Sequence, residues 1–289
     1  MNKKPLLSGL RNPIRGRHLL IWIILIILGF FSFCWIYPFL WMLSASFKST
    51  LEIFQKGLNL IPDHFSFDNY WRAWAKGGFS IYFMNSVITT AFSIIIVVLR
   101  CALAGYVLAK YNFPGKTFLM SLLIVTFLIP LGTTIIPTVQ LSQHLGLLNS
   151  RTGIILAMSG GGAVASILLY KSYFEKLPGS LAEAAVIDGA GFFTIFSRVM
   201  FPITGPVTAT VTILTFMGSW NNFMLPLVFT FGVPSLRTLP VGMMAFQSAN
   251  ETDWSGMASA GIMALVPIVV CFIALQKYFV SGIAGAVKG

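Results

Sequence analysis

The stretch EAAVIDGAGFFTIFSRVMFP, from Glu183 to Pro202, holds the side chains of this sequence that are best placed for chemistry with a partner. Six charged residues lie between positions 171 and 198, in a neighbourhood of long apolar runs: Lys171, Glu175, Lys176, Glu183, Asp188 and Arg198. Glu183 offers a carboxylate for a basic group, and Ala184 and Ala185 permit close backbone approach. The pattern indicates a helix that docks into a soluble partner. The alternative is a helix that lies on the bilayer surface.

A helix, a turn and a second helix must position these residues. Ser180 stands three residues before Glu183, which is the spacing of a capping box and predicts the start of a short helix. Gly189 allows this helix to stop and the chain to turn. A second helix follows and reaches its limit at Pro202.

The composition places this island in a membrane protein. Hydrophobic residues make up 56% of the chain, charged residues only 9%, and the mean hydropathy is +0.84. Such a chain has too few charges to cover a soluble fold. Apolar runs long enough for a helix to cross a hydrocarbon core of about 30 Å predict an all-α membrane protein with six transmembrane helices. The predicted spans cover approximately residues 19–45, 80–109, 117–140, 152–172, 203–231 and 257–279.

The basic residues predict the orientation of these spans. Residues 1–18 form a basic tail, and Lys and Arg are retained preferentially on the cytoplasmic side. With both termini in the cytoplasm, 13 basic residues lie inside and 6 outside. The loop 173–203 and the C-terminal tail 281–289 are then cytoplasmic. The charge of +11 is explained by topology and anionic lipid rather than by nucleic acid, because its largest cluster abuts the first span without an aromatic platform.

The island resembles the cytoplasmic EAA loop of ABC-importer permeases, in which E-A-A is followed by a Gly and later by I-x-L-P. This chain has Glu183, Ala184, Ala185 and Gly189 at the matching positions, and V-x-F-P, ending at Pro202, in place of the last motif. Further stretches are similar to maltose-type carbohydrate permeases, and most of all to their six-span subunit: "YPFLWMLSASFKS", "LAGYVLAKYNFPGK", "LGLLNSRTGIIL", "GSWNNFMLPLVF" and "YFVSGIAGAVKG".

The resemblance implies a type I ABC importer permease fold over residues 19–280, in a bacterial or archaeal cytoplasmic membrane. It implies four kinds of partner: a second, different permease, an ABC ATPase dimer, an extracellular or periplasmic solute-binding protein, and the lipid bilayer. ATP and Mg would be bound by the ATPase, so this chain is expected to carry no cofactor, metal site or catalytic residue of its own. The loop 173–203 would be the coupling loop, with these residues at the ATPase: Glu183, Ala184, Ala185, Asp188, Gly189 and Pro202.

Four side chains are candidates for a path that carries a sugar. Trp220, Asn221 and Asn222 lie about 28 Å along the fifth span, near its outer half. An aromatic ring stacks on a sugar face and amides bind hydroxyls, but the same residues suit an interfacial anchor with amides that bond between helices. Asn85 can line the cavity or cap the second span, and a cap is favoured. Gly160–Gly162 are interpreted as close helix packing.

Two other transport functions are weighed against an importer of sugars or oligosaccharides. The first keeps the ABC permease and changes the cargo to another solute such as glycerol phosphate. The second is an ion-coupled secondary transporter, which usually has acidic or histidine residues inside the membrane. All eight acids of this chain fall outside the charge-free runs, which counts against ion coupling.

Overall fold

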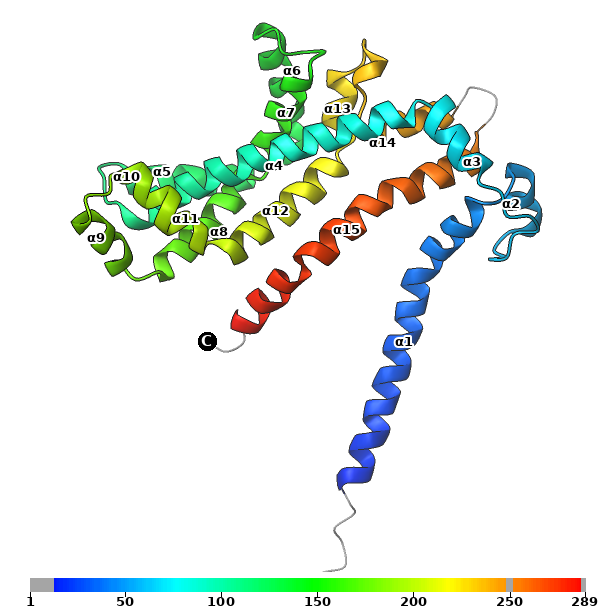
Figure 1. The fold of residues 1–289 in the computed structure, drawn as a ribbon, viewed down its shortest axis with the longest axis horizontal. Coiled ribbons are helices and arrows are strands. Elements are labelled where there is room, and N and C mark those ends of the chain that lie inside the picture. Colours follow the sequence, from blue (N-terminus) through cyan, green and yellow to red (C-terminus); the bar gives the residue numbers. More distant parts are fainter. Residues whose placement is uncertain (1–12, 248–251, 287–289) are drawn as a thin grey trace, which may run out of the picture.

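The computed structural model describes residues 13–247 and 252–286, which form helices joined by short loops (Figure 1). Within these ranges the only extended pairing is one isolated antiparallel bridge between Gln247 and Thr252. The predicted all-α fold is therefore confirmed. Most of the predicted basic tail, residues 1–12, and the last residues of the C-terminal tail, 287–289, lie outside the described residues.

Three single helices are long and apolar enough to cross a membrane: α1 (Pro13–Ala45), α4 (Phe79–Lys110) and α15 (Trp254–Ala286). Helices suit these sequences because every backbone polar group inside a hydrocarbon core needs a partner within its own segment. α15 continues as a helix to Ala286, beyond residue 279, where the predicted sixth span ends.

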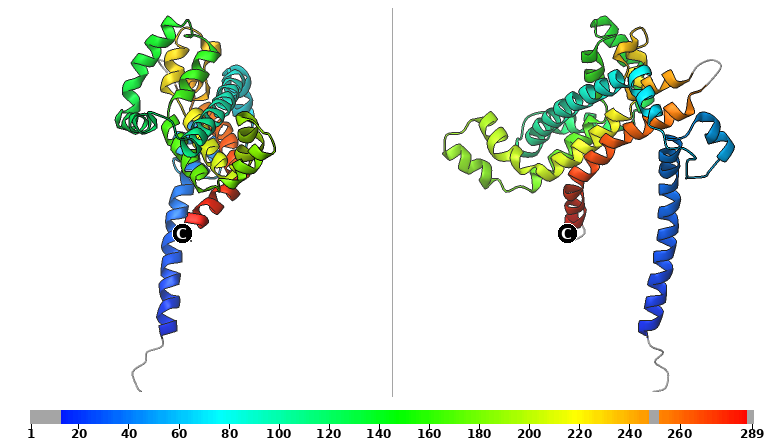
Figure 2. Two further views of the ribbon diagram at one scale, coloured as in Figure 1. Left: turned by 90° about the vertical axis from the view of Figure 1, so that its left-hand side faces the viewer. Right: turned by 45° about the vertical axis from the view of Figure 1, so that its right-hand side comes forward.

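The N-terminal part of α1 extends away from the other helices (Figures 1 and 2), whereas its C-terminal end meets the bundle. It packs against α15, with Met42 of α1 close to Gly261 of α15. Large apolar side chains between Leu20 and Leu43 are exposed on all sides of α1. Such a surface needs lipid or another membrane-embedded chain around it, because a soluble helix shows an apolar stripe on one side only.

The remaining crossings are pairs of helices bent at a break. Two of these pairs are α5 (Lys116–Val125) with α6 (Ile135–His144), bent by 99°, and α7 (Arg151–Gly160) with α8 (Ala163–Lys176), bent by 56°. In the third, the helical segment 192–203 meets α12 (Gly205–Trp220) at 82°. Counting each pair as one crossing gives six, the predicted number.

These breaks divide several of the predicted spans into separate helices. Pro130 lies at the break before α6, as expected of a kinking proline, and the short 3₁₀ helices η2 (Thr126–Leu128) and η3 (Leu131–Thr134) flank it. Pro137 lies in the first turn of α6, where a backbone N–H would make no intrahelical hydrogen bond. It therefore does not kink α6. The predicted fifth span 203–231 is not one continuous helix, because α12 ends at Trp220 and α13 (Met224–Phe229) is a separate helix.

The interpretation of Gly160–Gly162 as close helix packing is wrong. These residues form the bend between α7 and α8, and no atom lies within 4 Å of the position that a Cβ would occupy on any of them. Gly162 has φ +66°, a conformation that other residues avoid, which explains why glycine stands at this bend.

The core lies where α4 packs along α8 and α12. At Gly105 of α4 the contact with α8 is tight, because a Cβ there would lie 2.6 Å from Tyr170 Cβ and 2.9 Å from the backbone nitrogen of Lys171. Small residues allow membrane helices to approach in this way and to gain dispersion energy over a long interface.

Short elements gather at the end of the bundle that α4 enters at Phe79 (Figure 1): α2 (Thr50–Lys56), α3 (Asp68–Trp71), η1 (Arg72–Lys76), η5 (Pro234–Leu236), α14 (Leu239–Gly242) and η6 (Met243–Phe246). Arg72 links η1 to α3 and to the residue before α15, since its Nη2 donates to Asn69 Oδ1 at 3.1 Å and to Asp253 Oδ1 at 2.9 Å. The buried Lys48 donates its Nζ hydrogen to the Asn59 carbonyl and thereby holds the loop after α2.

The packing at Gly105 generates a stability prediction. We expect Gly105→Ala to destabilise the chain by about 1–3 kcal/mol, because the added methyl group forces α4 away from α8. Gly160→Ala is the matched control, since open space surrounds Gly160, and its effect should stay within about 0.5 kcal/mol. Thermal unfolding of both variants in nanodiscs measures the difference. Equal midpoints for the two variants would show that the α4–α8 interface tolerates the methyl group.

Candidate functional site: the α9 protrusion

α9 (Ser180–Ile187) forms a protrusion between α8 and the segment 192–203 (Figure 1). Its N-cap is Gly179, which already has helical angles of φ −63° and ψ −30°. Ser180 therefore lies inside the first turn, and no side chain caps this helix. The predicted capping box of Ser180 with Glu183 is wrong for that reason.

The turn predicted at Gly189 is present. Gly189 has φ +78°, its N–H donates to the Val186 carbonyl at 3.0 Å, and the Ala190 N–H donates to the Ala185 carbonyl at 2.9 Å. These bonds satisfy the last carbonyls of α9 in the manner of a C-terminal glycine motif. The second helix follows without interruption through α10 (Phe192–Thr194), the π-helical η4 (Ile195–Met200) and α11 (Phe201–Ile203).

An aromatic cluster at the end of α4 supports the protrusion. The buried ring of Tyr106 lies 5.4 Å from the ring of Phe174, 5.7 Å from Phe192 and 5.5 Å from Phe196, measured between centroids. Aromatic pairs at such distances add stabilisation beyond the burial of their area. From α9, three residues pack against this core: Leu181, Ala182 and Ala185. α9 is therefore a short helix held by side chains of α4, α8 and η4.

The remaining surface of α9 and of the turn after it is exposed. It carries four of the six residues predicted to contact an ATPase: Glu183, Ala184, Asp188 and Gly189. Ala185 is half-buried and faces the core instead. Two large apolar side chains that the sequence analysis did not select are also exposed on α9, namely Val186 at 60% and Ile187 at 85%.

Pro202 lies apart from this surface. It belongs to α11, two residues before the bend at Thr204, and the Tyr173 hydroxyl donates to the neighbouring Ile203 carbonyl at 3.1 Å. The predicted helix limit at Pro202 is thus within one residue of the observed end at Ile203. Pro202 itself lies at the C-terminal end of the segment 192–203 and not on α9.

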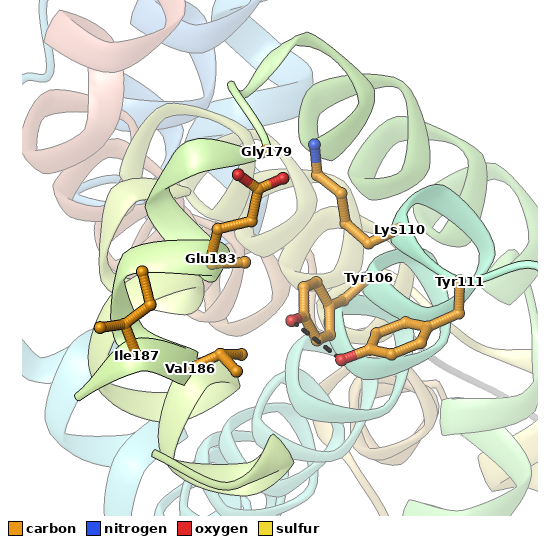
Figure 3. A pocket seen from close by; sticks show the side chains of 8 residues that line it. Tyr106, Lys110, Tyr111, Gly179, Glu183, Val186 and Ile187 are labelled. Atoms are coloured by element: carbon orange, nitrogen blue, oxygen red, sulfur yellow. Dashed lines mark hydrogen bonds between the residues drawn. The ribbon is translucent and has the colours of Figure 1, made fainter. Parts of the chain in front are cut away.

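A pocket of about 480 Å³ lies between α9 and the end of α4 (Figure 3). Its lining consists of Tyr106, Lys110, Tyr111, Gly179, Ala182, Glu183, Val186 and Ile187. The Glu183 carboxylate and the Lys110 ammonium reach toward the same edge of this pocket. Lys110 Nζ donates to the Leu177 carbonyl at 2.6 Å, which ties α4 to the chain just before α9. Glu183 takes part in none of the three ion pairs among the described residues.

This arrangement suits docking. Glu183 lies in the first turn of α9, where the helix dipole stabilises a carboxylate, and it is exposed to an incoming basic group. Val186 and Ile187 supply apolar area beside it. A partner with a cleft that has apolar walls and one cation would match both features.

The four residues predicted to line a path lie at the other end and do not form one group. The Trp220 ring is 3% exposed, it stacks on Phe216, and its Nε1 donates to the Ala264 carbonyl at 3.2 Å. Asn221 is exposed and donates from Nδ2 to the Met217 carbonyl, at the end of α12. Asn222 accepts at Oδ1 from the Leu225 N–H and supports the start of α13.

Asn85 does not cap α4, because this helix begins at Phe79, six residues earlier, with Gly78 as the N-cap. The favoured interpretation of Asn85 is therefore wrong. Its side chain is 1% exposed, and Nδ2 donates to the carbonyls of Ser235 at 2.8 Å and Arg237 at 2.9 Å. Through these two hydrogen bonds, Asn85 holds the segment 235–237, which precedes α14, against α4.

The comparisons with known proteins agree with this arrangement. Residues 101–285 match the family described as "Binding-protein-dependent transport system inner membrane component". The chain belongs to this family. The "Probable ABC transporter permease protein YurM" of Bacillus subtilis (strain 168) is 37% identical, over 88% of this permease and 84% of its own length. The "Diacetylchitobiose uptake system permease protein NgcG" of Streptomyces coelicolor is 36% identical, over 88% of this permease and 82% of its own length.

A solved structure has the same fold. It is the crystal structure of a bacterial ABC transporter involved in the import of the acidic polysaccharide alginate, with a TM-score of 0.82 and 23% identity. The match covers 96% of this permease and 100% of the other chain. The ABC-importer permease family predicted from residues 183–202 is thus confirmed. The permease is a multi-pass membrane component of a transport system that depends on a binding protein.

Three features of the permease site escaped the sequence analysis. The aromatic cluster around Tyr106, the Lys110 bond to the Leu177 carbonyl and the exposed pair Val186 and Ile187 depend on contacts between distant segments. The sequence did carry one signal for them, because the stretch "LAGYVLAKYNFPGK" that contains Tyr106 and Lys110 was among those similar to carbohydrate permeases.

The turn after α9 generates a second prediction. We expect Gly189→Ala to destabilise α9 locally by about 1–2 kcal/mol, because an alanine at φ +78° is strained. Gly191→Ala is the matched control, since Gly191 has φ −78° and no atom lies within 4 Å of its Cβ position. Hydrogen exchange of the α9 amides should accelerate roughly tenfold in Gly189→Ala alone. Equal exchange in both variants would contradict the role of Gly189 in this turn.

Proposed function

We propose that this permease is one of two different membrane subunits of an ATP-driven importer for sugars or oligosaccharides. The observation that carries the proposal is the α9 protrusion, which exposes Glu183 beside Val186 and Ile187 on a base of packed aromatic rings. A rigid base and an exposed tip are what a docking element needs, because force applied at the tip is passed to α4 and α8 through side chains that already touch.

The proposal places α9 and both termini in the cytoplasm of a bacterium or archaeon. The distribution of basic residues supports it, because 12 lie on the proposed cytoplasmic side and 6 on the other, with Arg100 inside α4. α9 and the end of α4 at Lys110 then face the cytoplasm, whereas α2, α3 and α14 face the outside. A solute-binding protein would approach the latter elements.

The partner at α9 would be an ATPase dimer that binds ATP and Mg, so that this chain needs neither. The ATPase would present a basic group to Glu183 and an apolar wall to Val186 and Ile187. Closure of the ATPase around ATP would pull α9, and the packing around Tyr106 would pass this movement to α4, α8 and η4. Asp188 and Gly189 lie at the exposed turn and would set the angle at which α9 enters the partner.

The proposed cargo is a carbohydrate. Support comes from the 36% identical relative, whose name specifies diacetylchitobiose uptake, and from the stretches of sequence that resemble maltose-type permeases. Another solute such as glycerol phosphate would need the same α9 protrusion, so the cargo is tested separately. A ligand screen of the binding protein encoded beside this chain distinguishes the two, and an ion-coupled transporter would recruit no ATPase at all.

The docking role generates a third prediction. We expect Glu183→Lys to reduce co-purification of the ATPase and solute uptake at least about tenfold, because it replaces a charge-assisted pair with repulsion between like charges. Glu183 is exposed, so the variant should keep its thermal stability. Glu175→Gln is the matched control, since Glu175 pairs with Lys171 on α8 rather than facing outward from α9.

The measurement is pull-down of the ATPase with the purified membrane subunits, followed by ATPase activity in nanodiscs with the loaded binding protein. Normal ATPase recruitment and uptake by Glu183→Lys would refute docking through α9. A folded complex that moves solute under an ion gradient without ATP would refute the importer itself.

A further inference from the structure

Arg100 is a charged residue inside a transmembrane helix. It lies on α4, ten residues before Lys110, which corresponds to about 15 Å along the helix axis. A hydrocarbon core is about 30 Å thick, so a helix with Lys110 at one membrane surface holds Arg100 near the middle. A cation at this depth costs several kcal/mol and usually marks a functional position.

The guanidinium reaches the break between α7 and α8. Arg100 Nη2 donates to the Ser159 carbonyl at 2.5 Å, at the end of α7, one residue before the glycines of the bend. This bond satisfies one carbonyl that the end of the helix leaves without an intrahelical donor. A guanidinium has five N–H donors, so this bond to α7 uses only one of them.

The surroundings of the break are open. Arg100 is exposed, and so are Gly160, Gly161 and Gly162, with no atom within 4 Å of their Cβ positions. Irregular backbone at membrane depth is tolerated where it is buried in protein or lines a water-filled cavity, and lipid cannot satisfy it. Since this chain does not bury the bend, the open side needs either a second membrane subunit or a hydrated path beside it, and the donors that Arg100 leaves unused favour the hydrated path.

Nothing in the described part of the chain neutralises the charge. The ion pairs among residues 13–247 and 252–286 are those of Lys56, Arg72 and Lys171, and none of them includes Arg100. The acids of the sequence all fall outside its charge-free runs. A negative group that meets Arg100 therefore comes from outside this chain.

We propose that Arg100 is a selectivity residue in the solute path and that it binds a carboxylate or sulfonate of an acidic sugar at the break between α7 and α8. The proposal rests on the proposed function, because it assumes that solute passes this chain. An anionic group would bind Arg100 more tightly than a neutral sugar, since the planar guanidinium offers paired N–H donors that match two anionic oxygens. Arg100 would thus favour acidic over neutral cargo.

The test uses the assembled importer in nanodiscs, with Cys34, Cys101 and Cys271 replaced by alanine and a reporter introduced as Gly161→Cys. A water-soluble maleimide should label this reporter, and Val97→Cys, which replaces a side chain only 2% exposed, is the buried control. The probes are lactobionate and lactose, and lactobionate carries a carboxylate on the open chain that replaces the reducing-end glucose ring of lactose. We expect lactobionate to slow labelling about tenfold relative to lactose.

Arg100→Gln should abolish this difference between the probes, and Arg100→Lys should retain part of it. Arg151→Gln, at the far end of α7, is the matched control and should retain all of it. Absence of labelling at position 161, equal protection by both sugars, or full protection in Arg100→Gln would each overturn the proposal. Loss of the second permease from the Arg100→Gln complex would also overturn it, because the anion would then belong to that subunit.

ATPase recruitment is measured in the same preparations. A complex that recruits the ATPase and responds to its binding protein, yet shows no preference for lactobionate, overturns the role of Arg100 and leaves the importer intact. A complex that recruits no ATPase overturns the proposed function first.

Discussion

The need to give every backbone carbonyl a donor inside a hydrocarbon core governs this structure. Straight helices such as α1 meet it within themselves, but each break in a helix releases carbonyls that need another partner. Side chains supply that partner: Arg100 at the end of α7, Lys110 after α8, Tyr173 at the bend before α12 and Asn85 before α14. These four side chains are thus placed where the helices are interrupted.

The same constraint connects the fold to the α9 site. Lys110 closes α4 and bonds the chain just before α9, so one side chain both ends a crossing and positions the protrusion. Around it, the Tyr106 cluster joins α4, α8 and η4 into one packed unit. α9 itself buries little and exposes its tip, which is the distribution of area expected of an element that is completed by a partner.

The sequence predicted the elements that depend on local rules. Apolar runs indicated the crossings, and Gly189 indicated the turn after α9, because hydrophobicity and backbone freedom act over a few residues. It predicted poorly what depends on distant contacts. The bends at Gly160–Gly162 and after Ile203 leave the apolar pattern unbroken, and the partners of Asn85, the carbonyls of Ser235 and Arg237, lie about 150 residues away in sequence. The predicted N-cap at Ser180 is wrong because Gly179 already has helical angles, so the helix starts one residue earlier than predicted.

The bend between α7 and α8 also divides one crossing into two mechanical parts. α8 packs along α4 and leads into α9, whereas α7 packs against both α4 and α13, and the glycines at positions 160–162 form the bend between α7 and α8. A straight helix would transmit any tilt along its whole length. Here α8 can tilt with α9 while α7 keeps its contacts with α13. Displacements at the two membrane faces therefore need not be equal in size or direction.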